Sequence, residues 1–537
     1  MLAVACNYPG FGGGQGEISA GELRATLQAH SFILTQVAAG MPTPAAPGIP
    51  ATPSSPETGL PVTPAPGTLA PGIPVPGTPE TMPTVQPGAP IIPPAAPPTP
   101  TAGALPLAFT YLSQSGDTLA AVALRFAVDP AEIVSNQPLD PTGYLPQAAL
   151  LGIPNRLENV ESAAWLLPDS EIVYSPSAAD FDISGFIQSA GGYLSRYTEP
   201  IHGVSHTGAE IVQRVATEAS INPRVLLASL QYQSGWVLGE PLNNEARIYP
   251  IGFGVPGRTG LYEELVMAAS HLGIGYYGWR AGSLLEIRFA DKTTARLSPE
   301  INAGTAALHL LFARINKRLV WAEAMFGTQS LPALHAALFG DPWARSAAYG
   351  PLLPDGLRLD ILELPFLPGE RWGFTGGPHL SWLSGSPQGA LDFSPVTSED
   401  ECAVSYTWAT AVAPGVITRA AHNLVALDID GDGREQTGWV IIYMHVATRD
   451  MIPAGSMVAQ DAQIGHPSCE GGQATGKHIH IARKYNGEWI AAGGPAPFVL
   501  SGWQVIAGER SYQGQLVKGD RVVTANSGGP ASSVIVR

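Results

Sequence analysis

The sequence predicts a multidomain α+β protein in which helices and antiparallel strands lie in separate domains. Its 537 residues exceed the size that one hydrophobic core usually serves, which indicates two to four domains. Helical periodicity dominates residues 180–345, whereas short β-runs between Gly and Pro turns dominate after about residue 370. A Pro-rich stretch without either periodicity precedes both regions.

The N-terminus, residues 1–40, is predicted to be lipoprotein-like. In "MLAVACNYPGFGGG", small residues precede Cys6 and a Gly-rich stretch follows it, which resembles the lipobox of bacterial lipoproteins. The resemblance implies that Cys6 is lipidated and that the true signal is longer than the one seen here. The alternative is a free cysteine in an unstructured terminus. No run of 18 apolar residues occurs, so we expect membrane contact through a lipid anchor alone.

Residues 41–107 are predicted to be a disordered, extended linker. About two fifths of the chain's 51 prolines fall here, with almost no charge and no apolar periodicity. Such a composition cannot bury a core and favours polyproline-like conformations. A spacer behind a lipid anchor would hold the following domains away from the membrane, as work in a cell wall requires.

Residues 108–156 are predicted to form a small mixed domain. After a short strand, Asp117 and Thr118 can cap a helix; a second helix follows Asp129, and a closing strand ends at Ile153. The segments "GDTL", "RFAV", "IVSNQ" and "LGIP" stand in the order and spacing of the LysM module, which this stretch resembles. The resemblance implies binding to N-acetylglucosamine-containing glycans, chiefly peptidoglycan. The alternative is a packing domain that binds no glycan.

Residues 180–345 are predicted to be mainly helical. Two amphipathic helices break at Pro223, and a long third helix is predicted in "SPEINAGTAALHLLFARINKRLVWAEAMF". The segment "NPRVLLASLQYQSGW" resembles the part of lysozyme-like transglycosylases that carries the catalytic Glu-Ser pair, but Gln233 and Ser234 stand there. Because an amide cannot act as the acid, we predict a degenerate lysozyme-like domain without that catalysis. The alternative is a helical spacer without a glycan groove.

Residues 365–510 contain a set of histidines and one aspartate that could hold and use a zinc ion. "TGGPHLSW" places His379 on a loop, "GALDFSP" places Asp392 on a strand, "GWVIIYMHVA" places His445 near a strand end, and "GKHIHIA" supplies His478 and His480. Hydrolytic zinc takes three His or carboxylate ligands and keeps one open position for water. Further imidazoles can accept the proton of that water. His478 and His480 alone could equally be surface residues.

In this order the four segments resemble the β-lytic and lysostaphin-type zinc metalloendopeptidases, which cleave peptidoglycan peptides. The resemblance implies that His379, Asp392 and His480 bind one zinc ion and that His445 and His478 are catalytic. The common branch of the family has His-x-x-x-Asp, and Gln388 stands at that spacing here. The separation of His379 from Asp392 fits the longer loop of the β-lytic branch, so His379 departs furthest from the common pattern.

Residues 511–537 are predicted to be a C-terminal tail. Two smaller features, a cysteine pair and an acidic cluster, lie within residues 365–510. If Cys6 is the anchor, Cys402 and Cys469 remain as an even pair, as expected for one disulfide in an oxidising compartment. "DIDGDGREQTGW" resembles the start of a calcium loop. It would use the acidic cluster, which consists of Asp428, Asp430 and Asp432. A hairpin tip explains the same residues as well.

Together these features predict a cell-envelope or extracellular protein, lipid-anchored in a bacterium, that hydrolyses peptide bonds in peptidoglycan stem peptides or cross-bridges. The alternative is a non-enzymatic wall-binding protein or an activator of another hydrolase. Such relatives usually lack ligands that this chain keeps. A third hypothesis, a glycan-cleaving enzyme run by the middle domain, is disfavoured by Gln233. The formal net charge of −16 argues against nucleic acid as a partner.

Overall fold

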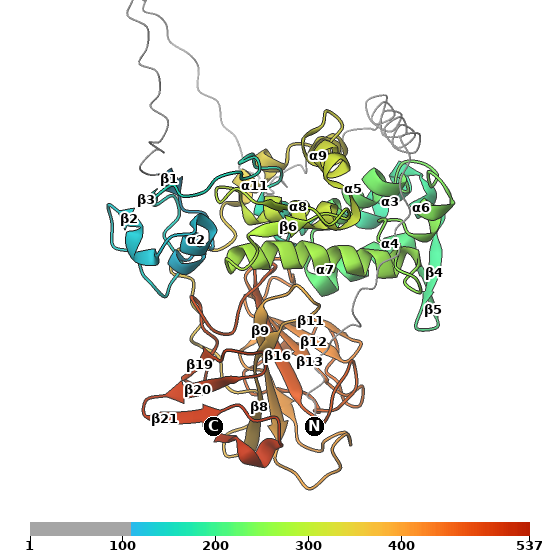
Figure 1. The fold of residues 1–537 in the computed structure, drawn as a ribbon. Helices are drawn as coiled ribbons and strands as arrows, with labels where there is room; N and C mark the ends of the chain where they lie inside the picture. Colours follow the sequence, from blue (N-terminus) through green and yellow to red (C-terminus); the bar gives the residue numbers. More distant parts are fainter. Residues whose placement is uncertain (1–108) are drawn as a thin grey trace, which may run out of the picture. The chain divides into compact units, whose positions relative to one another are not determined.

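The computed structural model describes residues 109–537 of the chain. These residues form helices and antiparallel sheets in separate regions, which confirms the predicted α+β class (Figure 1). The lipoprotein-like terminus with Cys6 and the linker over 41–107 lie outside the described residues. Within 109–537, no helix combines the length and the apolar character needed to cross a lipid bilayer.

The first described segment is a small antiparallel sheet with one helix, in the strand order β1-β3-β2. Its elements are β1 (Phe109–Leu112), α2 (Leu119–Phe126), the 3-10 turn η1 (Pro130–Glu132), β2 (Val134–Ser135) and β3 (Leu150–Ile153). Thr118 caps α2 as predicted. Asp117 does not: its carboxylate accepts a hydrogen bond from Tyr111 and pairs with Arg125. The second predicted helix is only the turn η1.

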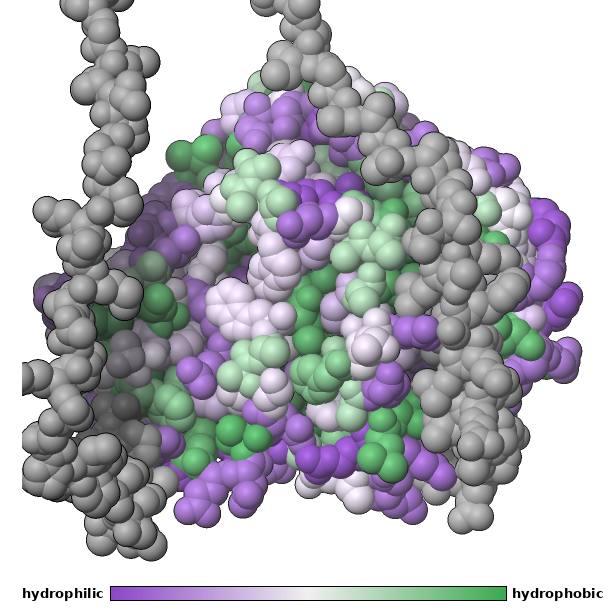
Figure 2. Space-filling view, turned by 90° about the horizontal axis from the view of Figure 1, so that it is seen from above, coloured by the Kyte–Doolittle hydropathy of each residue, from purple (hydrophilic) through white to green (hydrophobic). Residues whose placement is uncertain are grey.

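The helical region follows, with nine α-helices and two short hairpins among the described residues. The helices are α3 (Ile183–Ala190), α4 (Gly208–Ala219), α5 (Pro223–Ser234), α6 (Asn244–Ile248), α7 (Gly260–Arg280), α8 (Ala303–Ile315), α9 (Arg318–Phe326), α10 (Leu331–Phe339) and α11 (Pro342–Tyr349). The hairpins are β4 (Thr198–Ile201) with β5 (Val204–Thr207), and β6 (Glu286–Arg288) with β7 (Thr294–Arg296). The face seen from above mixes hydrophilic and hydrophobic residues (Figure 2).

The break predicted at Pro223 is confirmed, but the predicted long third helix is wrong. The chain ends α8 at Ile315 and starts α9 at Arg318. Asn316 between them is extended, with φ −127° and ψ 150°. The Asn316 carbonyl accepts the N–H of Ala290 instead of an intrahelical donor. A tertiary hydrogen bond thus overrides a periodicity that continues across the break.

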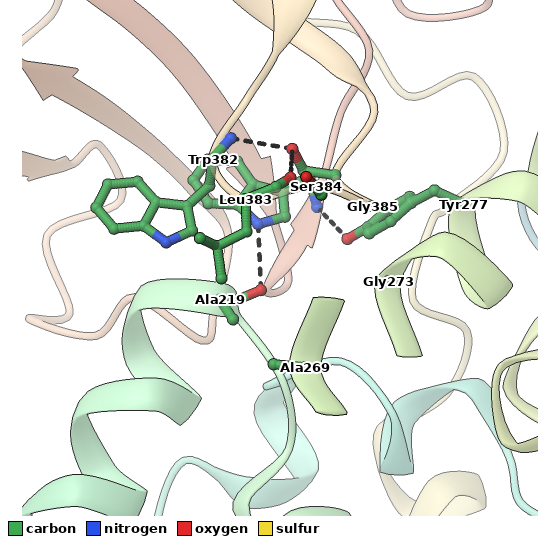
Figure 3. A pocket seen from close by; sticks show the side chains of 10 residues that line it. Ala219, Ala269, Gly273, Tyr277, Trp382, Leu383, Ser384 and Gly385 are labelled. Carbon is green, nitrogen blue, oxygen red and sulfur yellow. Dashed lines mark hydrogen bonds between the residues drawn. The ribbon is translucent and has the colours of Figure 1, made fainter. Parts of the chain in front are cut away.

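The longest helix, α7, packs against α8 on one side and contacts the C-terminal sheet on the other. A Cβ atom on Gly275 of α7 would lie 2.5 Å from the Cα of Ala307, so glycine permits this close helix approach. On the sheet side, the backbone N–H of Trp489 donates a hydrogen bond to the hydroxyl oxygen of Tyr277 at 2.9 Å. Figure 3 shows this helix beside the loop that contains Trp382 and Gly385.

The C-terminal region is built on a nine-stranded antiparallel sheet in the order β14-β11-β12-β13-β16-β9-β8-β22, with β17 paired to β16. Its strands are β8 (Arg371–Leu380), β9 (Gln388–Pro395), β11 (Gly415–Ala421), β12 (Leu424–Asp428), β13 (Trp439–Met444), β14 (Met457–Val458), β16 (Ile479–Tyr485), β17 (Glu488–Trp489) and β22 (Val534–Val536). A two-stranded sheet pairs β10 (Ala409–Thr410) with β15 (Gln463–Gly465).

Residues 511–537, predicted to be a C-terminal tail, instead contain three strands that are paired in sheets. A four-stranded sheet contains β18 (Val499–Leu500), β19 (Trp503–Ala507), β20 (Gly514–Lys518) and β21 (Arg521–Thr524). After the turn η5 (Pro530–Ser532), β22 pairs with β8 at the edge of the main sheet. Ile535 is buried there opposite Trp372. These strands are too short to give a clear alternating pattern.

Both faces of the main sheet are buried, against different partners. Leu391, Phe393, Ile479 and Ile481 belong to the core of the C-terminal region. Their neighbours in the strands, including Ala390 and Ala482, belong to the core shared with the helical region. Because successive strand residues point to opposite faces, Asp392 and His480 lie on the face that the helical region partly covers.

Candidate metal centre

Three adjacent strands bring His379, Asp392 and His480 together. Asp392 of β9 is directly opposite His480 of β16. On the other side, β8 pairs with β9 through a register that shifts between Gly376 and His379. His379 therefore lies in β8, not on the predicted loop. A Cβ atom on Gly376 would lie 2.2 Å from Asp392 Oδ2, so glycine makes room for the carboxylate.

The three side chains present one donor atom each to a common point. His379 Nε2 lies 3.3 Å from Asp392 Oδ1 and 3.0 Å from His480 Nδ1. His480 Nδ1 lies 3.6 Å from Asp392 Oδ1. Ligand atoms at ~2.0–2.1 Å around tetrahedral zinc are about 3.3–3.4 Å apart. Asp392 Oδ1 is buried without a hydrogen-bond donor, as a metal ligand is before its metal is added.

Backbone carbonyls select the tautomer of both candidate histidine ligands. His379 Nδ1 donates to the carbonyl of Gly377 at 2.9 Å, which leaves a lone pair on Nε2. His480 Nε2 donates to the carbonyl of Ser381 at 3.1 Å, which leaves a lone pair on Nδ1. These are the two nitrogens that converge with Asp392. Outer hydrogen bonds of this kind orient histidine ligands in metal sites.

The charges of the cluster also suit a cation. Burial alone would raise the pKa of Asp392, but His379 and His478 hold it well below its usual range. Burial, with a smaller contribution from the neighbouring His379, lowers the pKa of His480 to about 3. For His379, burial would lower the pKa, but the charge of Asp392 and the hydrogen bonds to Asp392 and Gly377 together raise it. At neutral pH the carboxylate is ionised and His480 is neutral, as metal binding requires.

His445 and His478 lie beside these donor atoms, and each leaves its Nε2 lone pair unused by the backbone. His445 Nδ1 donates to the carbonyl of Glu470 at 2.9 Å, and His478 Nδ1 donates to that of Gly476 at 2.7 Å. Their ring centroids are 4.5 Å apart. His478 Nε2 lies 3.7 Å from Asp392 Oδ1.

The backbone conformation of His445 separates it from an ordinary strand residue. Strand β13 ends at Met444, opposite His480, and His445 follows with a φ of 61°. Positive φ is unfavourable for a residue with a Cβ atom and persists where the surrounding structure enforces it. Burial, with a smaller contribution from the neighbouring His478, lowers the pKa of His445 to about 4. His445 is therefore neutral at pH 7.

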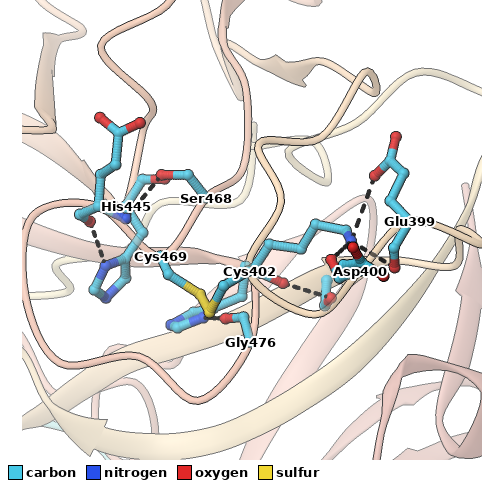
Figure 4. Close-up of a disulfide and its surroundings, with 11 residues drawn as sticks. Glu399, Asp400, Cys402, His445, Ser468, Cys469 and Gly476 are labelled. Atoms are coloured by element: carbon cyan, nitrogen blue, oxygen red, sulfur yellow. Dashed lines mark hydrogen bonds and ion pairs between the residues drawn. A yellow bond between two sulfur atoms is a disulfide. The ribbon is translucent and has the colours of Figure 1, made fainter.

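The predicted disulfide between Cys402 and Cys469 is confirmed, with their Cα atoms 5.4 Å apart. Figure 4 shows it beside His445 and Gly476. The bond fastens the segment that supplies the Glu470 carbonyl to the segment after β9. Lys477 reinforces this connection, since its Nζ donates to two carbonyls of residues 399–400 at 3.1 and 2.6 Å.

Tyr512 is a residue of this centre that sequence reasoning missed. Its ring stacks on His379, with centroids 4.2 Å apart and an interplanar angle of 17°. Its backbone exchanges hydrogen bonds with Gly377 and Pro378 of β8. No spacing in the sequence pointed to Tyr512, because it lies in the segment predicted to be a tail.

Among residues 109–537, one other group of acidic or histidine side chains could hold a metal, and it is the acidic cluster. It forms the tip of the β12–β13 hairpin, which was the alternative to a calcium loop. The carboxylate of Asp428 accepts the N–H groups of Asp430, Gly431 and Gly433. Its oxygens therefore stabilise the turn itself. Nothing found for this chain supports calcium.

Comparison with known proteins identifies relatives of both large regions. Residues 165–351 match the family model described as LasA, N-terminal domain. The chain is 26% identical over 357 residues to Protease LasA of Pseudomonas aeruginosa, covering 62% of this chain and 77% of that protein. It is 30% identical over 167 residues to the beta-lytic metalloendopeptidase of Achromobacter lyticus, covering 30% of this chain and 40% of that protein.

A solved structure of pseudoalterin, described as a novel M23 metalloprotease from the deep sea, is 22% identical. The comparison covers 33% of this chain and 98% of that chain, with a TM-score of 0.27. The sequence relatives confirm the predicted resemblance and the predicted class of enzyme, a zinc metalloendopeptidase. The match over 165–351 falls on the helical region. The lysozyme-like and LysM assignments stay predictions.

Proposed function

We propose that this chain binds one zinc ion through His379, Asp392 and His480 and hydrolyses peptide bonds of peptidoglycan, in stem peptides or cross-bridges. One observation carries the proposal: the three donor atoms lie 3.0–3.6 Å from one another, and Asp392 Oδ1 is buried without a donor. The donor set, two imidazoles and one carboxylate, suits zinc.

When bound, zinc lowers the pKa of a water ligand towards ~7 and polarises the scissile carbonyl. The protein's own residues supply the remaining chemistry. His445 and His478 are held by carbonyls so that each Nε2 can accept the proton of the attacking water. The same nitrogen, once protonated, can donate to the leaving amine. The low pKa of His445 favours a neutral, proton-accepting ring at pH 7.

Substrate class and location are part of the same proposal. The resemblance to β-lytic enzymes supports peptidoglycan as the substrate. The LysM-like segment would add affinity for the glycan strands. We place the protein in the bacterial cell envelope or outside the cell, held by a lipid on Cys6. The alternative, a non-enzymatic wall-binding protein, is disfavoured because a complete ligand set and two further histidines are present.

The proposal is tested by incubating the zinc-loaded protein with peptidoglycan of defined stem peptide and analysing the released fragments by mass spectrometry. We expect fragments with new amino termini from the wild type and none from His480→Ala. The mass of each fragment identifies the bond that is cut. Peptidoglycan that is bound but stays uncut by the zinc-loaded wild type would favour the wall-binding alternative.

A further inference from the structure

The loop between β8 and β9, residues 381–387, connects the strands that carry His379 and Asp392, and it also contacts the third candidate ligand. The carbonyl of Ser381, the first loop residue, accepts the Nε2 hydrogen of His480 at 3.1 Å. This hydrogen bond selects the tautomer of His480. The position of Ser381 therefore affects both the orientation of the ring and the donor atom offered to zinc.

The loop is internally bonded, so that a shift at its tip is transmitted to Ser381. The N–H of Ser381 donates to the carbonyl of Pro387 at 3.0 Å. The N–H of Trp382 donates to Ser386 Oγ at 3.0 Å, and Ser386 Oγ donates to the carbonyl of Leu383 at 2.9 Å. These hydrogen bonds connect the two ends and the tip of the loop, so the loop is expected to move as one unit.

The tip of this unit is seated directly on helix α7 (Figure 3). A Cβ atom on Gly385 would lie 2.4 Å from the carbonyl oxygen of Ser270 and 2.5 Å from the nitrogen of Ile274. From the helix side, a Cβ atom on Gly273 would lie 3.1 Å from the carbonyl oxygen of Gly385. The closest atoms at this contact are backbone atoms on both sides, which cannot move aside as the end of a flexible side chain can.

We propose that helix α7 is a positioning element of the metal centre: it fixes the 381–387 loop, and the Ser381 carbonyl in turn holds His480 ready to bind zinc. The helical region then sets the geometry of a ligand that lies on the C-terminal sheet. This inference rests on the zinc site proposed above. Gly273 and Gly385 do not touch the metal, and they act through Ser381.

The test replaces Gly273 by leucine in the full chain. The larger side chain pushes the loop away from α7, and the loss of an outer hydrogen bond to a metal-bound histidine typically weakens affinity by about 10–100-fold. We expect the zinc dissociation constant, measured by competition with a chelator, to rise in that range. We also expect the absorption bands of the cobalt-substituted protein to change, because they report ligand geometry.

Gly278→Leu is the matched control. Gly278 lies on the same helix, and its added Cβ would also meet a neighbour at 3.1 Å, but that neighbour is Leu284 of the helical region. We expect wild-type zinc affinity and cobalt bands. Equal weakening in both variants, or wild-type affinity in Gly273→Leu, overturns the inference. If Gly273→Leu does not fold, Gly273→Ala decides: unchanged cobalt bands overturn the inference. A wild-type protein that binds no zinc refutes the proposed function itself.

Discussion

The two clusters that could hold a cation differ in what their oxygen and nitrogen atoms already do. In the metal centre, backbone carbonyls engage the far nitrogens of His379 and His480, and Asp392 Oδ1 has no donor. In the acidic cluster, the oxygens of Asp428 accept N–H groups of their own turn. The spacing of acidic residues and histidines in the sequence alone made both clusters candidate metal sites. A metal site is distinguished by donor atoms that the fold supports from outside and leaves unused.

The largest effect expected from this comparison is the loss of zinc. His480→Ala or Asp392→Ala should abolish both bound zinc, about one ion per chain in the wild type, and peptidase activity, since three ligands are needed. Asp432→Asn in the acidic cluster is the control and should retain zinc. Metal content after dialysis measures the difference. Full zinc occupancy in either ligand variant would contradict the assignment.

The next effect separates binding from catalysis within the metal centre. His445→Ala and His478→Ala should keep zinc and lower turnover by ~10²–10⁴-fold, about 3–5 kcal/mol of barrier, because each removes a proton acceptor. Metal content and peptidoglycan hydrolysis are measured on the same preparation. His478→Ala without zinc would make His478 a ligand, and wild-type turnover in His445→Ala would remove His445 from the catalytic set.

A smaller effect concerns support from outside the centre. Replacing both Cys402 and Cys469 by serine should lower the free energy of unfolding of the sheet region by ~2–4 kcal/mol, because the bond closes a long loop. Denaturant unfolding with and without reductant measures it. The double variant is the control, since reductant should no longer matter there. A wild type that is indifferent to reductant speaks against a stabilising role.

The smallest effect lies in the acidic cluster. Partial burial and the neighbouring Asp428 raise the pKa of Asp430 to about 7. The folded state therefore binds a proton that the unfolded chain, with a pKa of ~3.9, releases, so the contribution of Asp430 to wild-type stability falls as pH rises from about 4 to 7. The Asp430→Asn variant lacks this loss of stability, so its melting temperature should rise slightly relative to that of the wild type as the pH increases from about 4 to 7. Because Asp430 is exposed, the shift in melting temperature is small. If the melting temperatures of the wild type and of Asp430→Asn change in parallel with pH, the effect is ruled out.

The sequence predicted the parts of the metal centre that local geometry determines. His478 and His480 are two residues apart, and a strand directs both to one side. The apolar run before His445 predicted the neighbouring strand. The position of His379 could not be predicted, because it depends on register shifts between β8 and β9 that have no local signal. The stacking of Tyr512 depends on chain that returns from far along the sequence.

The fold shows the same division between local and distant causes. Pro223 cannot lie inside a continuous helix and is instead the first residue of α5, so that break was predictable from the sequence alone. The separation of α8 from α9 depends on a hydrogen bond from Ala290, which no periodicity reveals. The strands after residue 511 gain their stability from β8 and β19, to which they pair. Because these pairing partners are distant in the sequence, the short segment by itself was predicted to be a tail.

The double burial of the main sheet bears on where this protein can be cut. Glu488, at the edge of the covered face, is buried and accepts a hydrogen bond from Tyr276 at 2.9 Å, and its carboxylate lies 3.3 Å from Arg280 of α7. A truncation that begins near residue 360 would strip Glu488 of its counter-charge and expose Ala482 and Trp489 to water. We therefore expect a protein that begins with the helical region to be more stable than one that begins with the first strand of the main sheet.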